Sequence, residues 1–173
     1  MFVLTGNAGK FTEIQLIFPE AIQMDVDLPE IQSLDPQEII EFKLMEASQI
    51  KEGAFMVEDT SLFCDGLNGL PGPLIKWFLK KLSLEQIVEK VGENSAAQAV
   101  TTVGYRTETG EMIYATGEVA GTIVSPRGDQ GFGWDMIFQP EGSDTTFGEM
   151  DRVEKTQYSM RRIALENLKG LLQ

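Results

Sequence analysis

Short apolar runs alternate with amphipathic segments along the first third of the chain. The apolar run 1–4 predicts a buried strand, and apolar side chains at helical spacing over 10–18 predict a helix that Pro19 ends. Residues 22–26 alternate between apolar and polar side chains, which predicts a second strand. An order of strand, helix and strand is typical of an α/β fold.

The pattern then leads to a pair of acids. An Asp-Pro pair opens the segment 35–50 and supplies an N-cap with proline at the first helical position, so we expect a helix through this segment. The apolar run 54–57 predicts a third short strand. This strand would deliver Glu58, Asp59 and Thr60 to its C-terminal end.

The second half of the chain changes in character. A loop rich in glycine and proline at 66–72 precedes a predicted helix at 73–82, and Ser83 begins another. Residues 97–125 are rich in β-branched and small side chains and predict two or three antiparallel strands, which we expect to form a second lobe or a long hairpin. A final amphipathic helix is predicted from Ser159, which would cap it.

Composition places these elements in one folded domain. The chain has 173 residues with 42% hydrophobic content, which suits a single domain over 1–173 with a subsidiary lobe. Cys64 is the only cysteine, which excludes an internal disulfide and a cysteine-cluster metal site. No apolar run approaches the roughly 20 residues that span a bilayer, and no signal peptide is evident. We therefore expect a soluble, cytoplasmic protein with no membrane partner.

Charge and the lack of histidine restrict the chemistry. A formal net charge of -13 disfavours binding to nucleic acid, because the phosphate backbone attracts basic surfaces. The chain has no histidine, so serine–histidine and cysteine–histidine catalysis are excluded. A small phosphorylated ligand remains compatible with this composition if local lysines and a metal offset the carboxylates.

Residues 3–12, VLTGNAGKFT, look at first like a phosphate-binding P-loop. That loop follows the pattern G-x-x-x-x-G-K-[ST], but here Leu4 stands at the first glycine and Phe11 at the hydroxyl residue. The match fails at both positions. A strand, a Gly-Asn turn and Lys10 at the start of a helix still describe a place where a helix N-terminus could meet an anion.

Acidic side chains are expected at three strand or loop ends. They are Asp27 with Glu30, Glu58 with Asp59, and Asp135. Ligands of open α/β sheets lie beyond the carboxyl ends of the strands, and magnesium prefers one or two carboxylates together with substrate phosphates. The alternative is that these acids are solvated loop residues or helix caps.

Cationic and aromatic residues supply further candidates. Lys10, Lys43, Lys76 and Lys155 could each bring a point charge to a polyphosphate, although an isolated lysine is usually only solvated. The segment 131–135, GFGWD, could present rings that stack on a planar base, or could form a core turn with buried aromatics. An arginine in the Ser-Met-Arg-Arg sequence that opens the last helix could donate a fork of hydrogen bonds.

Six stretches carry most of these candidates. They are TGNAGK (5–10), DLPEIQ (27–32), VEDTSLFCDGLNGLPGPLIKWFL (57–79), SPRGDQGFGWDMIFQPEG (125–142), FGEM (147–150) and EKTQYSMR (154–161). In this order they resemble the blocks of the inosine triphosphate pyrophosphatase family, and the resemblance covers nearly the whole chain.

The resemblance implies an enzyme and a fold. Family members hydrolyse aberrant purine nucleoside triphosphates, the inosine, deoxyinosine and xanthosine forms, to the monophosphate and pyrophosphate with Mg²⁺. The fold implied is α/β, a mixed elongated central sheet with flanking helices and two lobes around a substrate cleft. Members are usually homodimers.

The resemblance also implies roles for single residues. Asp59 is similar to the catalytic proton acceptor, and Glu30 and Asp59 to the metal-site acids. The substrate-binding residues that it implies are Thr5, Gly6, Asn7, Ala8, Gly9, Lys10, Lys43, Asp59, Thr60, Lys76, Phe132, Gly133, Trp134, Asp135, Lys155, Met160 and Arg161.

One position departs from the family pattern. The family has Ser-His-Arg where this chain has Ser159, Met160 and Arg161. A thioether is only a weak acceptor and cannot carry a proton's charge as histidine can. An alternative function is therefore a nucleotide-binding module with little turnover, or with broadened base specificity because of Met160. Whether Glu58 or Asp59 activates water is also left open.

Overall fold

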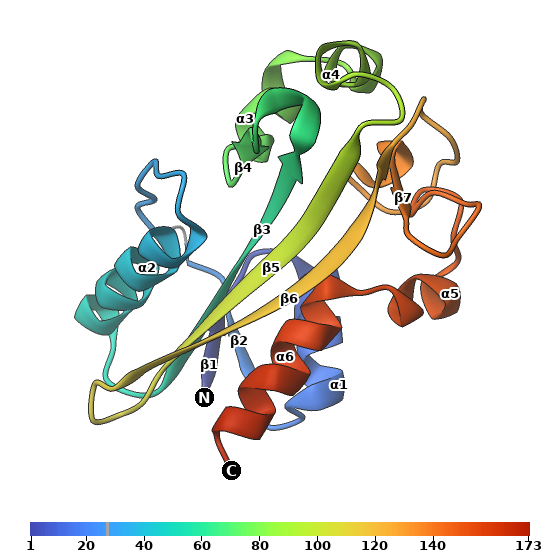
Figure 1. Cartoon of the computed structure of the whole chain (residues 1–173). Helices are drawn as coiled ribbons and strands as arrows, with labels where there is room; N and C mark the ends of the chain where they lie inside the picture. The colour runs from blue at the N-terminus through green and yellow to red at the C-terminus, as the bar shows by residue number, and fades with distance from the viewer. Residues whose placement is uncertain (27) are drawn as a thin grey trace. The chain divides into compact units, whose positions relative to one another are not determined.

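The computed structural model describes residues 1–26 and 28–173 and confirms the α/β class (Figure 1). A mixed sheet has the strand order β2-β1-β3-β5-β6-β7, with β4 paired to β3. The strands are β1 (Phe2–Leu4), β2 (Ile22–Met24), β3 (Phe55–Cys64), β4 (Pro71–Gly72), β5 (Ala96–Arg106), β6 (Met112–Ile123) and β7 (Phe138–Pro140). The helices are α1 (Ala8–Ile17), α2 (Pro36–Ile50), α3 (Ile75–Lys81), α4 (Leu84–Val91), α5 (Arg152–Gln157) and α6 (Met160–Leu171), with 3-10 turns at Asp65–Leu67 and Asp135–Ile137.

The chain forms two compact units. The first unit comprises 1–59, 101–117 and 161–173, and the second comprises 60–100 and 118–160. The segment 97–125, which was expected to form a second lobe, contains most of β5 and β6 and is divided between the two units.

Capping explains where two helices of the first unit begin. Asp35 accepts a hydrogen bond from the Gln37 N–H at 2.8 Å, so α2 starts at the predicted proline. Asn7 accepts from the Lys10 N–H at 3.1 Å, and α1 therefore begins at Ala8, two residues before the predicted start. The turn after β1 thus contributes its last residues to a helix N-terminus.

The third strand was predicted to end before the acid pair, and this prediction is wrong. β3 continues from Phe55 through Glu58 and Asp59 to Cys64. The strand continues because buried Leu62 extends the β pattern beyond the acids. Lysine and arginine side chains of neighbouring helices neutralise the two carboxylates. The strand whose C-terminal end lies near the two acids is β1.

Parallel pairing fixes this relation between β1 and β3. Val3 is level with Met56, and β1 ends at Leu4, so Glu58 and Asp59 lie on the part of β3 that runs past the end of β1. The two acids thus lie beyond the carboxyl end of β1, and ligands of open α/β sheets usually bind beyond such strand ends.

Successive side chains of β3 pack on opposite faces of the sheet in the first unit. Met56 packs in one hydrophobic cluster with Ile14 of α1 and Leu165 of α6. Phe55 and Val57 belong to another cluster, with residues of α2. Successive side chains of a strand point to opposite faces of the sheet. Glu58 is consequently directed toward α1 and α6, and Asp59 toward α2, as the helix positions in Figure 1 also indicate.

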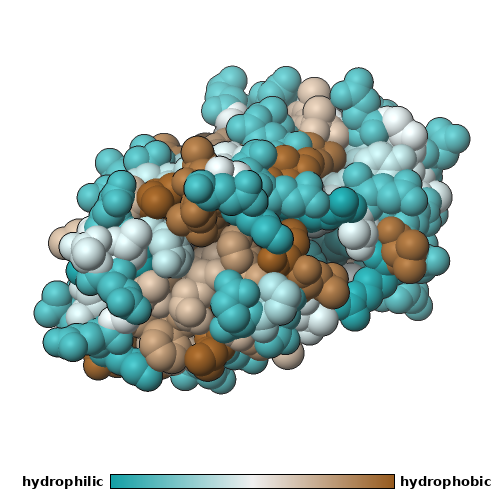
Figure 2. Space-filling model, turned by 90° about the horizontal axis from the view of Figure 1, so that it is seen from below, coloured by the Kyte–Doolittle hydropathy of each residue, from teal (hydrophilic) through white to brown (hydrophobic). Residues whose placement is uncertain are grey.

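Polar and apolar residues share the face of the molecule that is drawn in Figure 2. Figure 2 shows one face on which hydrophilic residues predominate and hydrophobic ones lie between them. Within residues 1–26 and 28–173, no helix is both long and apolar enough to cross a membrane.

Candidate active site

A buried carboxylate forms the centre of the first unit's charged groups. Glu58 is 8% exposed and forms an ion pair with Lys10 of α1 through Oε1. Its Oε2 lies 2.7 Å from Nε of Arg161, which follows the first residue of α6. Arg161 is itself buried, and its Nη1 lies 3.1 Å from Oε2 of Glu13 on α1. Strand β3 and two helices are thereby joined through one carboxylate.

These ion pairs keep Glu58 charged. Burial by itself raises a carboxyl pKa, but the positive charges of Arg161 and Lys10 outweigh burial and lower the pKa of Glu58 to about 2. Burial would likewise lower the pKa of Arg161, whereas Glu58 and Glu13 raise it overall. Both partners are ionised at neutral pH, and Glu58 is a poor proton acceptor.

Asp59 has a different set of neighbours on the opposite face. Its Oδ1 lies 3.4 Å from Nζ of Lys43 on α2, and the same Nζ lies 2.5 Å from Oε1 of Glu30. The Oδ2 atom of Asp59 is buried and accepts no hydrogen bond from any residue that the structure describes. One ammonium therefore serves two carboxylates.

The surroundings of Asp59 favour proton uptake. Burial raises the pKa of Asp59, and the nearby charges of Glu58 and Glu30 add to this, while Lys43 and Lys10 oppose it; the net direction is upward. The pKa of Lys43 is also raised, because its two carboxylate neighbours outweigh burial. The two adjacent acids thus have pKa values shifted in opposite directions.

The turn between β1 and α1 has the polar geometry of an anion site. Oγ1 of Thr5 accepts a hydrogen bond from the Asn7 N–H at 3.1 Å, and the Gln23 side chain donates to the Thr5 carbonyl at 2.8 Å. Residues 6–9 are exposed, and the first N–H groups of a helix have no partner within it. The helix N-terminus and Lys10 together provide positive potential beside Glu58.

Mg²⁺ fits the acids on the α2 face. Among residues 1–26 and 28–173, no group of three or more acidic or cysteine side chains gathers as a complete metal cage. Magnesium does not require one, because it binds through one or two carboxylates, waters and substrate phosphates. Glu30 and Asp59 converge on one ammonium, and the bare Oδ2 of Asp59 is a suitable donor. Asp27, also expected near this site, lies outside the described residues.

The second unit holds the aromatic segment. Oδ2 of buried Asp135 accepts from the Phe132 N–H at 2.8 Å and from Nζ of Lys155 at 2.6 Å. The Phe132 ring is 52% exposed, and Nζ of Lys155 lies 5.5 Å from its centre. A Cβ on Gly131 would lie 2.1 Å from Oδ2 of Asp135, so only glycine permits this turn. One carboxylate therefore fixes the backbone that presents an exposed ring.

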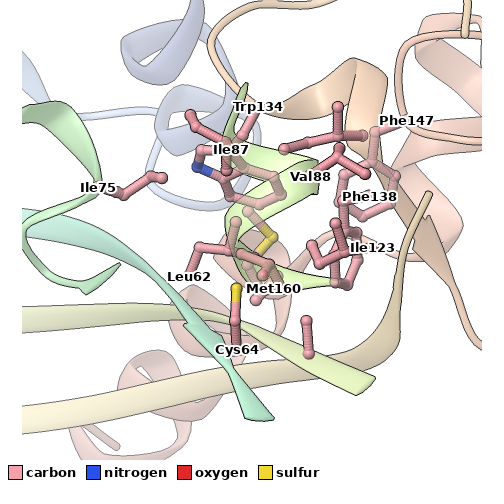
Figure 3. Packing of buried hydrophobic residues seen from close by; sticks show 14 of the residues in the cluster. Leu62, Cys64, Ile75, Ile87, Val88, Ile123, Trp134, Phe138, Phe147 and Met160 are labelled. Carbon is pink, nitrogen blue, oxygen red and sulfur yellow. The ribbon is translucent and has the colours of Figure 1, made fainter. Parts of the chain in front are cut away.

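Two other residues expected at the site are packed in the hydrophobic core. Trp134 and Met160 are 7% and 6% exposed, and both belong to the cluster in Figure 3. The Trp134 ring meets Phe138 edge-on, with 5.5 Å between ring centres. Their side chains thus support the segment from within the unit.

The expected site residues fall into two groups. Those of the first unit are Thr5, Gly6, Asn7, Ala8, Gly9, Lys10, Glu30, Lys43, Asp59 and Arg161. Those of the second are Thr60 on β3, the exposed Lys76 on α3, Phe132, Gly133, Trp134, Asp135, Lys155 and Met160.

Two acids of the first unit were missed or undervalued from the sequence. Glu13 was not considered, although it follows Lys10 by three residues and so shares its helix face. Glu58 was treated as an alternative base, but it is the common partner of Lys10 and Arg161.

Comparison with known proteins extends the similarity over the whole chain. A sequence model described as the Ham1 family matches residues 1–171. An inosine triphosphate pyrophosphatase of Kluyveromyces lactis is 39% identical over 98% of this chain and 93% of its own length. One of Neurospora crassa is 42% identical over 95% of this chain and 88% of its own length. The structure of the Staphylococcus aureus Ham1 protein matches with a TM-score of 0.85 at 26% identity, covering 99% of this chain and 97% of that one.

Glu58→Gln should destabilise the protein strongly. Removal of one partner from a buried ion pair leaves buried charge uncompensated, so we expect the free energy of unfolding to fall by about 3 to 5 kcal/mol at neutral pH. Because the folded pKa of Glu58 is about 2 and its ordinary value is 4.5, its ionisation stabilises the fold above pH 4.5. That contribution is lost as the pH falls from 4.5 toward 2.

Urea unfolding followed by circular dichroism at several pH values measures this effect. Glu166→Gln is the matched control, because Glu166 forms an exposed ion pair with Arg162 at 2.8 Å. The control should cost less than about 1 kcal/mol. An equal cost for the two variants, or a Glu58→Gln cost that does not shrink at acid pH, would contradict this role of Glu58.

Proposed function

Because the chain belongs to the Ham1 family, we propose that it is a hydrolase that cleaves aberrant purine nucleoside triphosphates to the monophosphate and pyrophosphate. Its substrates would be the inosine, deoxyinosine and xanthosine triphosphates, which it would remove from the nucleotide pool. The observation that carries the proposal is the match, over almost the whole chain, to relatives named inosine triphosphate pyrophosphatase. The paired cations and acids of the first unit supply suitable chemistry.

The triphosphate is proposed to bind at the turn between β1 and α1. The N-terminus of α1 lies at this turn and carries the positive end of the helix dipole, and Lys10 and Lys43 would add two charges that neutralise phosphate oxygens. Positioning and charge neutralisation supply most of the catalysis in transfers of this kind.

Mg²⁺ is proposed to be held by Asp59 and Glu30. When bound, it would polarise phosphate oxygens and neutralise charge that develops on the leaving group. The bare Oδ2 of Asp59 and the convergence of both carboxylates on Lys43 support this assignment.

Asp59 is proposed as the proton acceptor in preference to Glu58. Both oxygens of Glu58 are engaged by cations and its pKa is about 2, whereas burial raises the pKa of Asp59. A general base works best when its pKa approaches the working pH.

The proposed reaction is one displacement. A water oxygen attacks the α-phosphorus while its proton passes to the Asp59 carboxylate. The bond from the α-phosphorus to the oxygen that bridges the α- and β-phosphates breaks, and its electron pair stays on that oxygen. Pyrophosphate and the nucleoside monophosphate are the products.

The purine is proposed to stack on the Phe132 ring. This ring is exposed, and its backbone is fixed through Asp135, which Lys155 also binds. Selection of inosine and xanthosine requires a hydrogen-bond donor to the carbonyl at position six of the purine. Adenine lacks this carbonyl. We assign this donor to N–H groups of the segment 131–135. Met160 and Trp134 would shape the segment from the core.

Arg161 is proposed to act by positioning. The resemblance assigns it to the nucleotide, but its guanidinium is buried and held by Glu58 and Glu13. It would thereby fix the strand that carries Asp59. Thr60, Gly133 and Lys76 are retained as proposed substrate contacts.

A cytoplasmic homodimer is proposed as the working form. The family resemblance supports the homodimer, and a single buried cysteine, Cys64, is compatible with a reducing compartment.

Purified protein with Mg²⁺ should release pyrophosphate from inosine and xanthosine triphosphates. We expect kcat/KM for adenosine triphosphate to be at least about 100-fold lower, because adenine cannot accept the hydrogen bond at position six. Guanosine triphosphate, which has the same carbonyl, is the informative fourth substrate. Equal rates on all four would indicate a general nucleotide pyrophosphatase, and tight binding of inosine triphosphate without product would indicate a binding module.

Asp59→Asn should lose turnover. Loss of a proton acceptor costs about 100- to 10,000-fold in kcat, and loss of a metal ligand adds to it. Pyrophosphate release by the variant, with its fold checked by circular dichroism, measures the effect. Near-normal turnover would remove Asp59 from the mechanism.

A further inference from the structure

Lys43 forms ion pairs with both carboxylates that are proposed to bind the metal, Glu30 and Asp59. Its Nζ lies 2.5 Å from Glu30 and 3.4 Å from Asp59, and its side chain is only 14% exposed. Lys43 is therefore the direct counter-ion of both proposed metal ligands. A divalent cation at the same carboxylates would lie close to this ammonium and be repelled by it.

Position makes Lys43 the competitor, because its single ammonium contacts a carboxylate oxygen of each proposed metal ligand. Lys10 adds a second positive charge, but Glu58 pairs with it on the other face of the strand. Lys43 is thus the cation that competes directly with a metal.

The backbone of Lys43 is held in its helix, whereas its side chain is of an intrinsically flexible type. Its helix is capped by Asp35, and neighbouring Leu44 is fully buried, so α2 cannot shift easily. A lysine side chain carries its ammonium on a flexible stem of four carbons. A bound triphosphate would offer the ammonium an alternative anionic partner and release the two carboxylates.

We propose that Lys43 is an internal competitor for the metal, which keeps the metal site closed until a triphosphate draws the ammonium away. Metal and nucleotide then bind cooperatively, since each removes an obstacle to the other. Free Mg²⁺ would bind weakly to the protein alone. This inference rests on the proposed function, because it assumes the same metal ligands and the same phosphate site.

Binding of Mn²⁺, measured by electron paramagnetic resonance as a probe for Mg²⁺, tests the proposal without turnover. In the absence of nucleotide, Lys43→Met should bind Mn²⁺ about tenfold more tightly than wild type, a coupling of ordinary size. Lys43→Arg keeps the charge and should remain weak. Lys90→Met removes an equal charge from an exposed position of α4 and should also resemble wild type.

Two further measurements locate the effect. Asp59→Asn added to Lys43→Met should abolish the gain in affinity. A non-hydrolysable α,β-imido analogue of inosine triphosphate should tighten Mn²⁺ binding more in wild type than in Lys43→Met. If Lys43→Met does not fold, Lys43→Gln should show the same direction of change.

Unchanged or weaker Mn²⁺ binding by Lys43→Met would overturn the proposal, as would an equal gain in Lys90→Met, which would indicate a general charge effect. The outcome is separable from that of the proposed function. A protein that releases pyrophosphate but shows no gain in Lys43→Met contradicts only the competition. A protein that shows the gain without releasing pyrophosphate contradicts only the reaction.

Discussion

The arrangement of β3, α1 and α6 in the first unit depends on the ion pairs that Glu58 forms with Lys10 and Arg161. A carboxylate in the middle of a buried strand would be costly without them, because its charge would be desolvated and unpaired. With them, β3 runs without interruption past the end of β1, and α1 and α6 are tied to it by charge as well as by apolar packing. The proposed site is therefore built on a continuous strand.

The two-residue period of that strand separates two tasks. Glu58 faces the cations of α1 and α6 and stays ionised, which suits a structural role. Asp59, one residue later, faces α2 and has a raised pKa. Adjacent acids are thus given opposite properties by the faces on which they lie. Such a separation allows a destabilising acid, which is the proposed catalytic group, to be carried by a stabilised strand.

Local features of the fold were predictable from the sequence, and distant partnerships were not. The helix from Asp35 and the aromatic GFGWD segment follow from caps and short motifs. The length of β3 could not be predicted, because the partner that neutralises Glu58 lies 103 residues away in Arg161. The burial of Met160 was also hidden, since a residue at a helix start can face the core or the solvent.

The free energy of unfolding of Asp59→Asn at neutral pH tests the separation of tasks most directly. A raised folded pKa means that ionised Asp59 costs stability above its ordinary pKa, and Lys43 keeps Glu30 as a partner after the substitution. The variant should therefore be as stable as wild type or more stable. A loss comparable to that expected for removal of the Glu58 charge would show that both acids hold the fold together, and would contradict the separation.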